Sequence, residues 1–316
     1  MLSLSLLLLN SCKESDEISG DDVSGNSPVL VSASSASTFT RAYLPDGMYD
    51  NFKVCAAEEK DGVNTVVMNG YEVNFVAGDW TYVKDTQPLA YWNTNADRYL
   101  FTAGAPIKAV IAISETSMTL SLENNTTESA MASEPLKIEK GSDDFGKRVN
   151  LRFAYAHCRV CVAFEKNGAE DVAVTDITLT PQKNIAKKAN VTYSYDWSEA
   201  TPKATQQVST TETSAEAFCF ADVTIPANST EAQTSATHYY CVPDANNEKQ
   251  WSVSVKCNGE QKAATFVNNE TWQSGKNYIY VFSLSEKNPK LVKVISQDMY
   301  FDCNDIVSGG EFPLTP

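Results

Sequence analysis

Short segments in which apolar and polar residues alternate recur along most of this chain of 316 residues. Tyr71, Val73 and Phe75 alternate with polar neighbours, and the same pattern holds in residues 118–122, 191–197 and 251–257. A period of two with one apolar face is typical of a half-buried β-strand. Because no segment shows a sustained helical period, the sequence predicts an all-β protein.

Turn signals separate these segments. Asp61-Gly62, Asn69-Gly70 and Asn258-Gly259 are dipeptides that favour tight turns between strands. Many short strands joined by such turns favour antiparallel β-sandwiches. Residues 201–215, which are rich in threonine and serine, are predicted to form a long loop or an edge region.

Residues 151–164 and residues 278–284 are each predicted to be one strand that lacks a polar face. Each is therefore expected in the middle of a sheet with both faces covered. Length favours about 150 residues per domain, and each stretch falls near the end of a block of that size. The sequence thus predicts two tandem β-sandwich domains, over residues 29–167 and 168–316.

The N-terminus has the pattern of an export signal. Residues 2–9 are all leucine or serine, and Asn10, Ser11 and Cys12 follow. An apolar run before a small residue is typical of a signal peptide, and the sequence up to the cysteine resembles a bacterial lipobox, whose cysteine receives diacylglycerol. We therefore predict a lipoprotein signal peptide over residues 1–11 and lipid attachment at Cys12.

The residues after Cys12 are polar and acidic, as expected of a tether rather than a packed element. Residues 12–28 are accordingly predicted to be an acidic tether between the lipid and the fold. Apolar runs are too short for a spanning helix, which needs about 18 residues or more. The expected location is the outer membrane surface, reached through the lipid on Cys12.

The net charge of −15 argues against a nucleic-acid partner, since phosphate binding needs a basic surface. Cys158 and Cys161 match C-x-x-C, but residues i and i+3 of a strand point to opposite faces. The two cysteines are predicted to be separate core residues, and the spacing of cysteine and histidine predicts no zinc site. We predict no metal and no cofactor.

His157 and His238 are the two histidines of the chain, and both are predicted to be structural. The chain lacks the common nucleophile, zinc-protease and phosphate-loop motifs. We therefore predict that the protein is not an enzyme. The alternative is a hydrolase, which would need a histidine-based triad or two facing carboxylates in a cleft.

Five tryptophans are candidates for either core packing or sugar stacking: Trp80, Trp92, Trp197, Trp251 and Trp272. Core packing is the prediction, because Trp197 and Trp251 fall on the apolar side of alternating strands. Exposed aromatic side chains would instead favour the alternative function, a surface glycan-binding lipoprotein.

Several short motifs occur in a characteristic order along the chain. They are FTRA at residues 39–42, W at 80, AYW at 90–92, YLFTAGAP at 99–106 and VNLRFAYAHCRV at 149–160. Their order resembles that of the fimbrillin family, the subunits of type V pili on Gram-negative anaerobes. Asn93 stands where the family commonly has proline, and Tyr155 where it has histidine.

The resemblance implies two transthyretin-like sandwiches in tandem and a defined route of assembly. The precursor is exported as a lipoprotein, and an arginine-specific, trypsin-like protease cuts in the loop after the first strand. The lipid and the first strand leave, and a strand from the next subunit fills the exposed groove. Because this contact is head-to-tail, it builds filaments.

Carried onto this sequence, the resemblance places the exchanged first strand at Val29, Leu30 and Val31, extending toward residue 39. Arg41 is the single lysine or arginine between residues 13 and 53, so cleavage is expected between Arg41 and Ala42. The alternative is that residues 40–42 are merely part of a strand.

The donor strand is expected within residues 291–312, where aspartates interrupt the alternation. An anchor or tip subunit that keeps its lipid is therefore the second form of the hypothesis. The predicted function is a surface-exposed lipoprotein precursor of a fimbrial subunit in adhesion and biofilm formation. Its expected partners are other fimbrial subunits, the outer membrane, the protease and an unidentified surface ligand.

Overall fold

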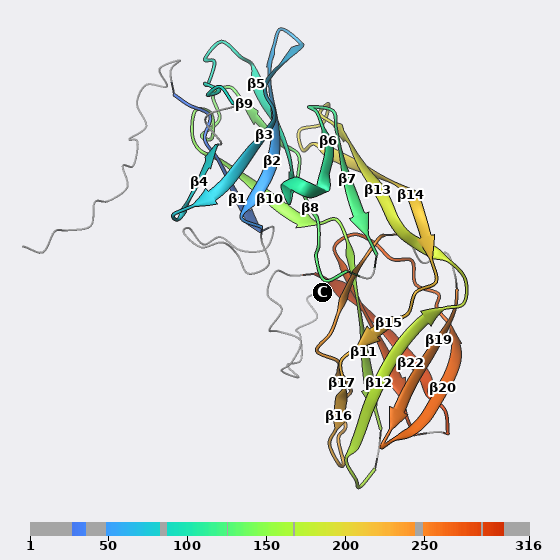
Figure 1. Ribbon diagram of the computed structural model, residues 1–316. Helices are drawn as coiled ribbons and strands as arrows, with labels where there is room; N and C mark the ends of the chain where they lie inside the picture. The colour runs from blue at the N-terminus through green and yellow to red at the C-terminus, as the bar shows by residue number, and fades with distance from the viewer. Residues whose placement is uncertain are drawn as a thin grey trace, which may run out of the picture.

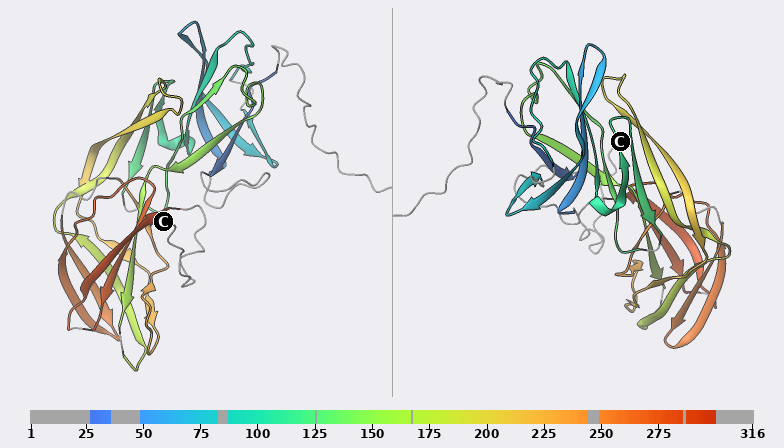
Figure 2. Two further views of the ribbon diagram at one scale, coloured as in Figure 1. Left: turned by 180° about the vertical axis from the view of Figure 1, so that it is seen from behind. Right: turned by 45° about the horizontal axis from the view of Figure 1, so that its top comes forward.

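The computed structural model describes residues 27–35, 49–82, 87–124, 126–166, 168–243, 249–285 and 287–299. These residues form strands β1 to β22 and one short 3-10 helix, η1 (Ile107–Ala109). The prediction of an all-β sandwich protein is confirmed. The sheets lie in two parts placed end to end, the upper and the lower part of Figure 1. Figure 2 shows the same two parts from behind and with the top of the molecule tilted toward the viewer.

The upper part contains an eight-stranded sheet that curls around its own core. Its order is β1 (Val31–Ser35), β10 (Val149–Tyr155), β8 (Met131–Ser133), β5 (Arg98–Ala105), β2 (Asn51–Lys60), β3 (Val63–Val76) and β4 (Asp79–Tyr82), with β9 (Leu136–Glu139) also pairing with β5. β1 at one edge lies against β4 at the other edge. The curled sheet therefore encloses side chains from most of its strands in one apolar core.

A four-stranded sheet covers the other face of the curled sheet. Its order is β14 (Lys203–Ser214), β13 (Ile185–Asp196), β7 (Ser117–Glu123) and β6 (Val110–Ile113). Within β5, Phe101 and Ala103 face the core of the curled sheet. Leu100 instead belongs to the core that contains Met118 and Leu120 of β7. β5 is thus buried on both faces and separates the two cores.

The lower part is a sandwich of two sheets. One has the order β17 (Gln233–Thr234), β11 (Cys158–Glu165), β21 (Lys276–Ser283) and β22 (Lys290–Asp298), with β18 (Tyr239–Cys241) also on β11. The other has the order β15 (Phe218–Phe220), β12 (Val172–Pro181), β19 (Gln250–Cys257) and β20 (Glu260–Val267), with β16 (Val223–Ile225) also on β12. Phe218, Trp251 and Tyr280 are among the side chains that fill the core between them.

Several strand predictions are confirmed in detail. The apolar residues of 118–122 and 251–257 are all buried, in β7 and β19. Residues 278–284 lie mostly in β21, which runs between β11 and β22 with both faces covered. Of the two alternatives for residues 201–215, the edge region is correct, because Lys203–Ser214 form the exposed edge strand β14.

The prediction of one continuous strand over residues 151–164 is wrong. The segment is two strands, β10 in the curled upper sheet and β11 in the lower sandwich, separated by Ala156 and His157. β10 alternates between buried and exposed residues, whereas β11 is buried almost throughout. The sequence looks continuous because the chain passes directly from one sheet to another without a polar turn.

The predicted domain limit at residue 167 lies between β11 and β12. Strands from both sides of it share a sheet, since β13 of the β13–β14 hairpin pairs with β7 in the upper part (Figure 1, yellow beside green). Alternation identifies strands but not their partners, so this crossing could not be read from the sequence. The domain limits themselves stay a prediction.

Gly104 in β5 permits the close approach of the two upper sheets. A Cβ atom there would lie 2.6 Å from the Met118 sulfur and 2.8 Å from a methyl of Val110. We expect Gly104→Ala to reduce the free energy of unfolding by about 1–3 kcal/mol, because overpacking forces neighbours apart. Urea unfolding measures the change. Gly168→Ala is the matched control, since a Cβ atom there would meet only the end of the Lys166 side chain, at 3.6 Å; equal losses would contradict this account.

Candidate strand-exchange site

β1 is held in the curled sheet through a parallel ladder with β10. Val31 pairs with Val149, Ala33 with Leu151, and Ser35 with Phe153. Among the described residues, every other pairing of this sheet is antiparallel. A parallel ladder is slightly less stable per residue than an antiparallel one. β1 is therefore the one strand of this sheet, among the described residues, that is held by the slightly less stable kind of ladder.

The residues just before β1 are bonded on both sides. The Val29 N–H donates to the Ala90 carbonyl at 2.9 Å, and the Trp92 N–H donates to the Ser27 carbonyl at 2.9 Å. On the opposite side, the Val149 N–H donates to the Leu30 carbonyl at 2.8 Å. Residues 27–30 thus lie in a slot between the start of β10 and residues 90–92.

The side chains of this segment alternate between the core and the surface. Val29 and Val31 are 0% and 2% exposed and belong to the core of the curled sheet, whereas Leu30 is half-buried. Burying a valine completely stabilises a fold by about 1.5–3 kcal/mol. The two valines together account for about twice that value, which the sheet would lose if the segment left its slot empty.

Aromatic side chains fill the same core. Phe52 of β2 lies with ring centroids 5.0 Å from Trp80 and 5.4 Å from Phe153, the residue that pairs with the end of β1. Trp92 contacts Tyr99 at a centroid distance of 4.6 Å. Without the first strand, part of this apolar core would face water, and such a surface favours association with another apolar segment.

An ion pair links the two strands that flank β1. Arg148, which precedes β10, donates from Nη1 to Asp79 Oδ1 at 2.7 Å and from Nη2 to Oδ2 at 3.3 Å. Asp79 begins β4, the strand that β1 also touches. Both side chains are well exposed, so the pair contributes little free energy. It does join the walls of the slot through atoms that do not belong to β1.

Three of the predicted site residues, Val29, Leu30 and Val31, therefore come together with β10 in one slot. Cys12, Arg41 and Ala42 lie outside the described residues. Sequence reasoning did not identify residues 90–92 and β10 as the partners of the first strand. In the sequence, these two segments were identified only by motifs that resemble those of the family. Neither motif indicates which strand the segment pairs with.

All five tryptophans are buried, with at most 9% of their surface exposed: Trp80, Trp92, Trp197, Trp251 and Trp272. The prediction of core packing is confirmed. The glycan-binding alternative required tryptophans that face the solvent, so it loses its main support.

His157 is packed at the junction of the two parts. Its Nδ1 accepts from the Ala130 N–H at 2.9 Å, and its Nε2 lies 3.2 Å from the carbonyl of Glu123, to which it donates in the neutral ring. Burial lowers its pKa to about 4. The pKa of His238 is also lowered, by burial first and then by the charge of Arg159. With both nitrogens engaged by backbone groups, His157 is the structural residue that was predicted.

Cys158 and Cys161 lie on opposite faces of β11, as predicted. Cys158 belongs to the core of the lower sandwich, and Cys161 to a small cluster on the outer face with Ile279. Among the described residues, no three histidine, cysteine or acidic side chains cluster as a metal site would require. In that same part of the chain, no helix is long and apolar enough to span a membrane.

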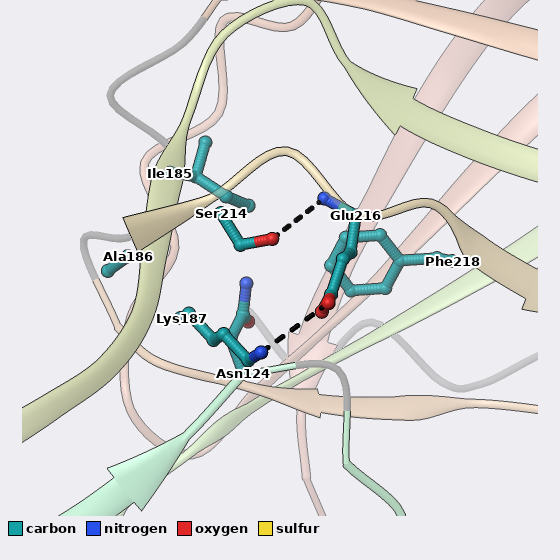
Figure 3. Close-up of a pocket in the computed structure, with 7 residues that line it drawn as sticks. All are labelled: Asn124, Ile185, Ala186, Lys187, Ser214, Glu216 and Phe218. Carbon is teal, nitrogen blue, oxygen red and sulfur yellow. Dashed lines mark hydrogen bonds and ion pairs between the residues drawn. The ribbon is translucent and has the colours of Figure 1, made fainter. Parts of the chain in front are cut away.

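A small pocket lies where the upper and lower parts meet. It is lined by residues of both: Asn124, Ile185, Ala186, Lys187, Ser214, Glu216 and Phe218. Figure 3 shows Lys187 reaching across it to Glu216, at 3.4 Å, while the Glu216 N–H donates to Ser214 Oγ. The charged side chains of the pocket thus bind each other, and this arrangement favours a structural contact over a ligand site.

A family model described as fimbrillin-like matches residues 32–297, which is most of the chain. The chain belongs to the fimbrillin-like family. This assignment confirms the resemblance and supports the role of a fimbrial subunit at the cell surface, in a family that is structural rather than enzymatic. No curated protein matches the chain.

Solved structures share the fold at low sequence identity. A candidate cell adhesion protein from Bacteroides uniformis ATCC 8492 has 11% identity and a TM-score of 0.53, over 87% of this chain and 99% of that one. Another, from Bacteroides ovatus ATCC 8483, has 10% identity and a TM-score of 0.50, over 86% and 98%. At such identities the likeness of the fimbrillin-like chain to these proteins concerns the fold alone.

The packing of the first strand can be tested by truncating its two buried valines. We expect Val29→Ala combined with Val31→Ala to lower the free energy of unfolding by about 2–5 kcal/mol, because it leaves cavities in the core of the curled sheet. Leu30→Ala is the matched control, and we expect less than about 1 kcal/mol from it. Urea unfolding of the three proteins measures this; equal effects would show that Val29 and Val31 are not the buried face.

Protonation of His157 should destabilise the junction. Its pKa is about 4 in the fold, against about 6.5 in an unfolded chain. Between these values the unfolded state binds more protons, so the stability that is complete above pH 6.5 is lost as the pH falls toward 4. We expect this histidine to contribute about 3 kcal/mol to that loss. His157→Asn should unfold with a correspondingly flatter pH dependence, and an unchanged slope would contradict the assignment.

Proposed function

We propose that this chain is a surface-exposed lipoprotein precursor of a fimbrial subunit, which assembles by exchange of its first strand and serves adhesion and biofilm formation. The observation that carries the proposal is the slot of Val29, Leu30 and Val31. There a short segment leads into a parallel strand, and its buried valines complete a core that is built mostly by the other strands of the curled sheet. The membership of the fimbrillin-like family supports it.

The way β1 is attached suits a removable segment. Its backbone ladder joins it to β10 alone among the strands of the described part, and the ion pair of Arg148 with Asp79 can keep the walls of the slot together after it leaves. A strand that entered antiparallel to β10 would form the slightly more stable kind of ladder. It would also bury the exposed apolar core again. Both effects favour replacement of β1 over an empty slot.

Cleavage between Arg41 and Ala42 would detach the first strand from β2. Arg41 falls in residues 36–48, between β1 and the segment that leads into β2, and it is the single basic residue there. An arginine-specific protease would therefore free residues 27–35 from the rest of the fold while leaving β2 and every later strand continuous.

The donor strand is proposed to come from the C-terminal segment of another copy. Residues 290–298 already form β22, which pairs with β21 in the lower sandwich. The part of the predicted donor region that remains is therefore residues 300–312, which lie outside the described residues. Val292 and Ile295 of β22 are 50% and 38% exposed, so an incoming surface could also contact this edge strand.

Cleavage by the protease is the first test of the proposal. We expect limited digestion of the full chain with an arginine-specific protease to yield a product that begins at Ala42, followed by the appearance of oligomers in size-exclusion chromatography. Arg41→Ala should block both, whereas Arg148→Ala should leave the cut at Arg41 intact. Mass spectrometry identifies the new N-terminus. A product that begins at Ala42 but stays monomeric at high concentration would contradict strand exchange.

The lipid on Cys12 is the second test. We expect cells that express the full chain to incorporate labelled palmitate into it and to hold it in the outer membrane fraction. Cys12→Ser should lose the label and the membrane attachment, because a lipid chain rather than a spanning helix provides the anchor. Mature surface protein that begins at Cys12 would favour the anchor or tip form of the proposal. Label that persists in Cys12→Ser would refute lipid attachment at this residue.

A further inference from the structure

Two buried cysteines face each other across neighbouring strands of the lower sandwich. Cys158 of β11 is paired directly with Cys241 of β18, and both are 0% exposed. Side chains that are opposite each other in an antiparallel ladder project to the same face. The contact of Cys158 Sγ with the Cys241 carbonyl, at 3.4 Å, agrees with this placement.

The backbone pairing brings the two residues within reach of a disulfide. Tyr240 directs its N–H and carbonyl to Thr126, at 2.8 and 3.3 Å, so the backbone groups of Cys241 point the other way, to β11. Cys158 and Cys241 are therefore a hydrogen-bonded pair, for which the Cα atoms are about 5.5 Å apart. Disulfides join Cα atoms that are about 4.4–6.8 Å apart.

We propose that Cys158 and Cys241 form a cross-strand disulfide when the protein passes through the oxidising compartment outside the inner membrane. This inference rests on the proposed function, which places the chain at the cell surface, where disulfides persist. In the reaction the two thiols lose two protons and two electrons and form one sulfur–sulfur bond. The disulfide of a thiol oxidoreductase accepts them and becomes two thiols.

The other described cysteines are placed differently. Cys161 lies on the outer face of β11 beside Asn277, and Cys219 of β15 is exposed and pairs with Thr178. Cys257 pairs with Glu260 and Val174, and Cys55 with Thr102 in the upper part. Cys158 and Cys241 are thus the two among them that face each other in a ladder, which makes this pairing specific.

The proposed bond would be reducible. Cβ atoms in a ladder pair are about 4.5–5.5 Å apart, whereas a disulfide needs about 3.5–4.5 Å. The two strands must move together slightly, and the strain favours reduction. β18 is bonded to β11 on one side and to Thr126, after β7, on the other. The disulfide would therefore hold a strand that joins the lower part to the upper part.

Peptide mapping without reductant tests the proposal. The full chain is exported to a bacterial periplasm, its thiols are alkylated in denaturant, and it is digested with trypsin. We expect residues 153–159, which contain Cys158, to be joined to residues 204–249, which contain Cys219 and Cys241. The joined pair should weigh about 2 Da less than its two thiol peptides together.

Cysteine variants assign the partner. The joined peptide should persist in Cys219→Ser and in Cys161→Ser and disappear in Cys241→Ser. If Cys241→Ser fails to fold, the wild type and Cys219→Ser still decide the question. Complete alkylation of Cys158 in both proteins, or a joined peptide that disappears in Cys219→Ser, would overturn the proposal.

Discussion

The upper part of the molecule depends on the packing of two valines from a segment that is held by one parallel ladder and by a short bonded contact before it. Val29 and Val31 complete the core of the curled sheet, yet β1 is joined to it through β10 and the short segment at residues 90–92. Burial of the two valines contributes a large favourable free energy, whereas the backbone hydrogen bonds of the segment contribute a modest one. A core built in this way would lose the burial of both valines if the slot stood empty. In the proposal of strand exchange, this loss is the reason that a strand from another subunit binds in the slot after β1 leaves.

The rest of the structure keeps that slot in shape. β5 is buried between two cores, and Gly104 lets the four-stranded sheet approach it closely. His157 holds Ala130 and Glu123 at the point where the chain passes from the upper to the lower part. The walls of the slot therefore belong to a framework that does not include β1, which is the physical requirement for a strand that can be replaced.

The sequence predicted the strands better than it predicted their partners. Alternation identified β7 and β19, and a run of apolar residues on both faces identified β21. These strands could be predicted because a buried face requires apolar residues, which are visible in the sequence. The pairing of the β13–β14 hairpin with β7 does not change the apolar pattern of the sequence, and neither does the break at His157 between β10 and β11. At the candidate site, the order of motifs indicated the first strand, whereas its parallel pairing with Val149 and Leu151 depends on long-range contacts that alternation does not encode.

The most direct measurement uses a reversible bond between β1 and β10. Ser32 and Asn150 pair in register, with their side-chain oxygens 3.5 Å apart on the exposed side of the ladder. In the variant Ser32→Cys with Asn150→Cys, a disulfide at this position should hold the first strand in its slot after cleavage at Arg41. The account predicts a cleaved monomer that forms oligomers only when reductant is added, while Ser32→Cys alone forms them at once. Oligomers of equal size and yield from the oxidised variant would contradict it.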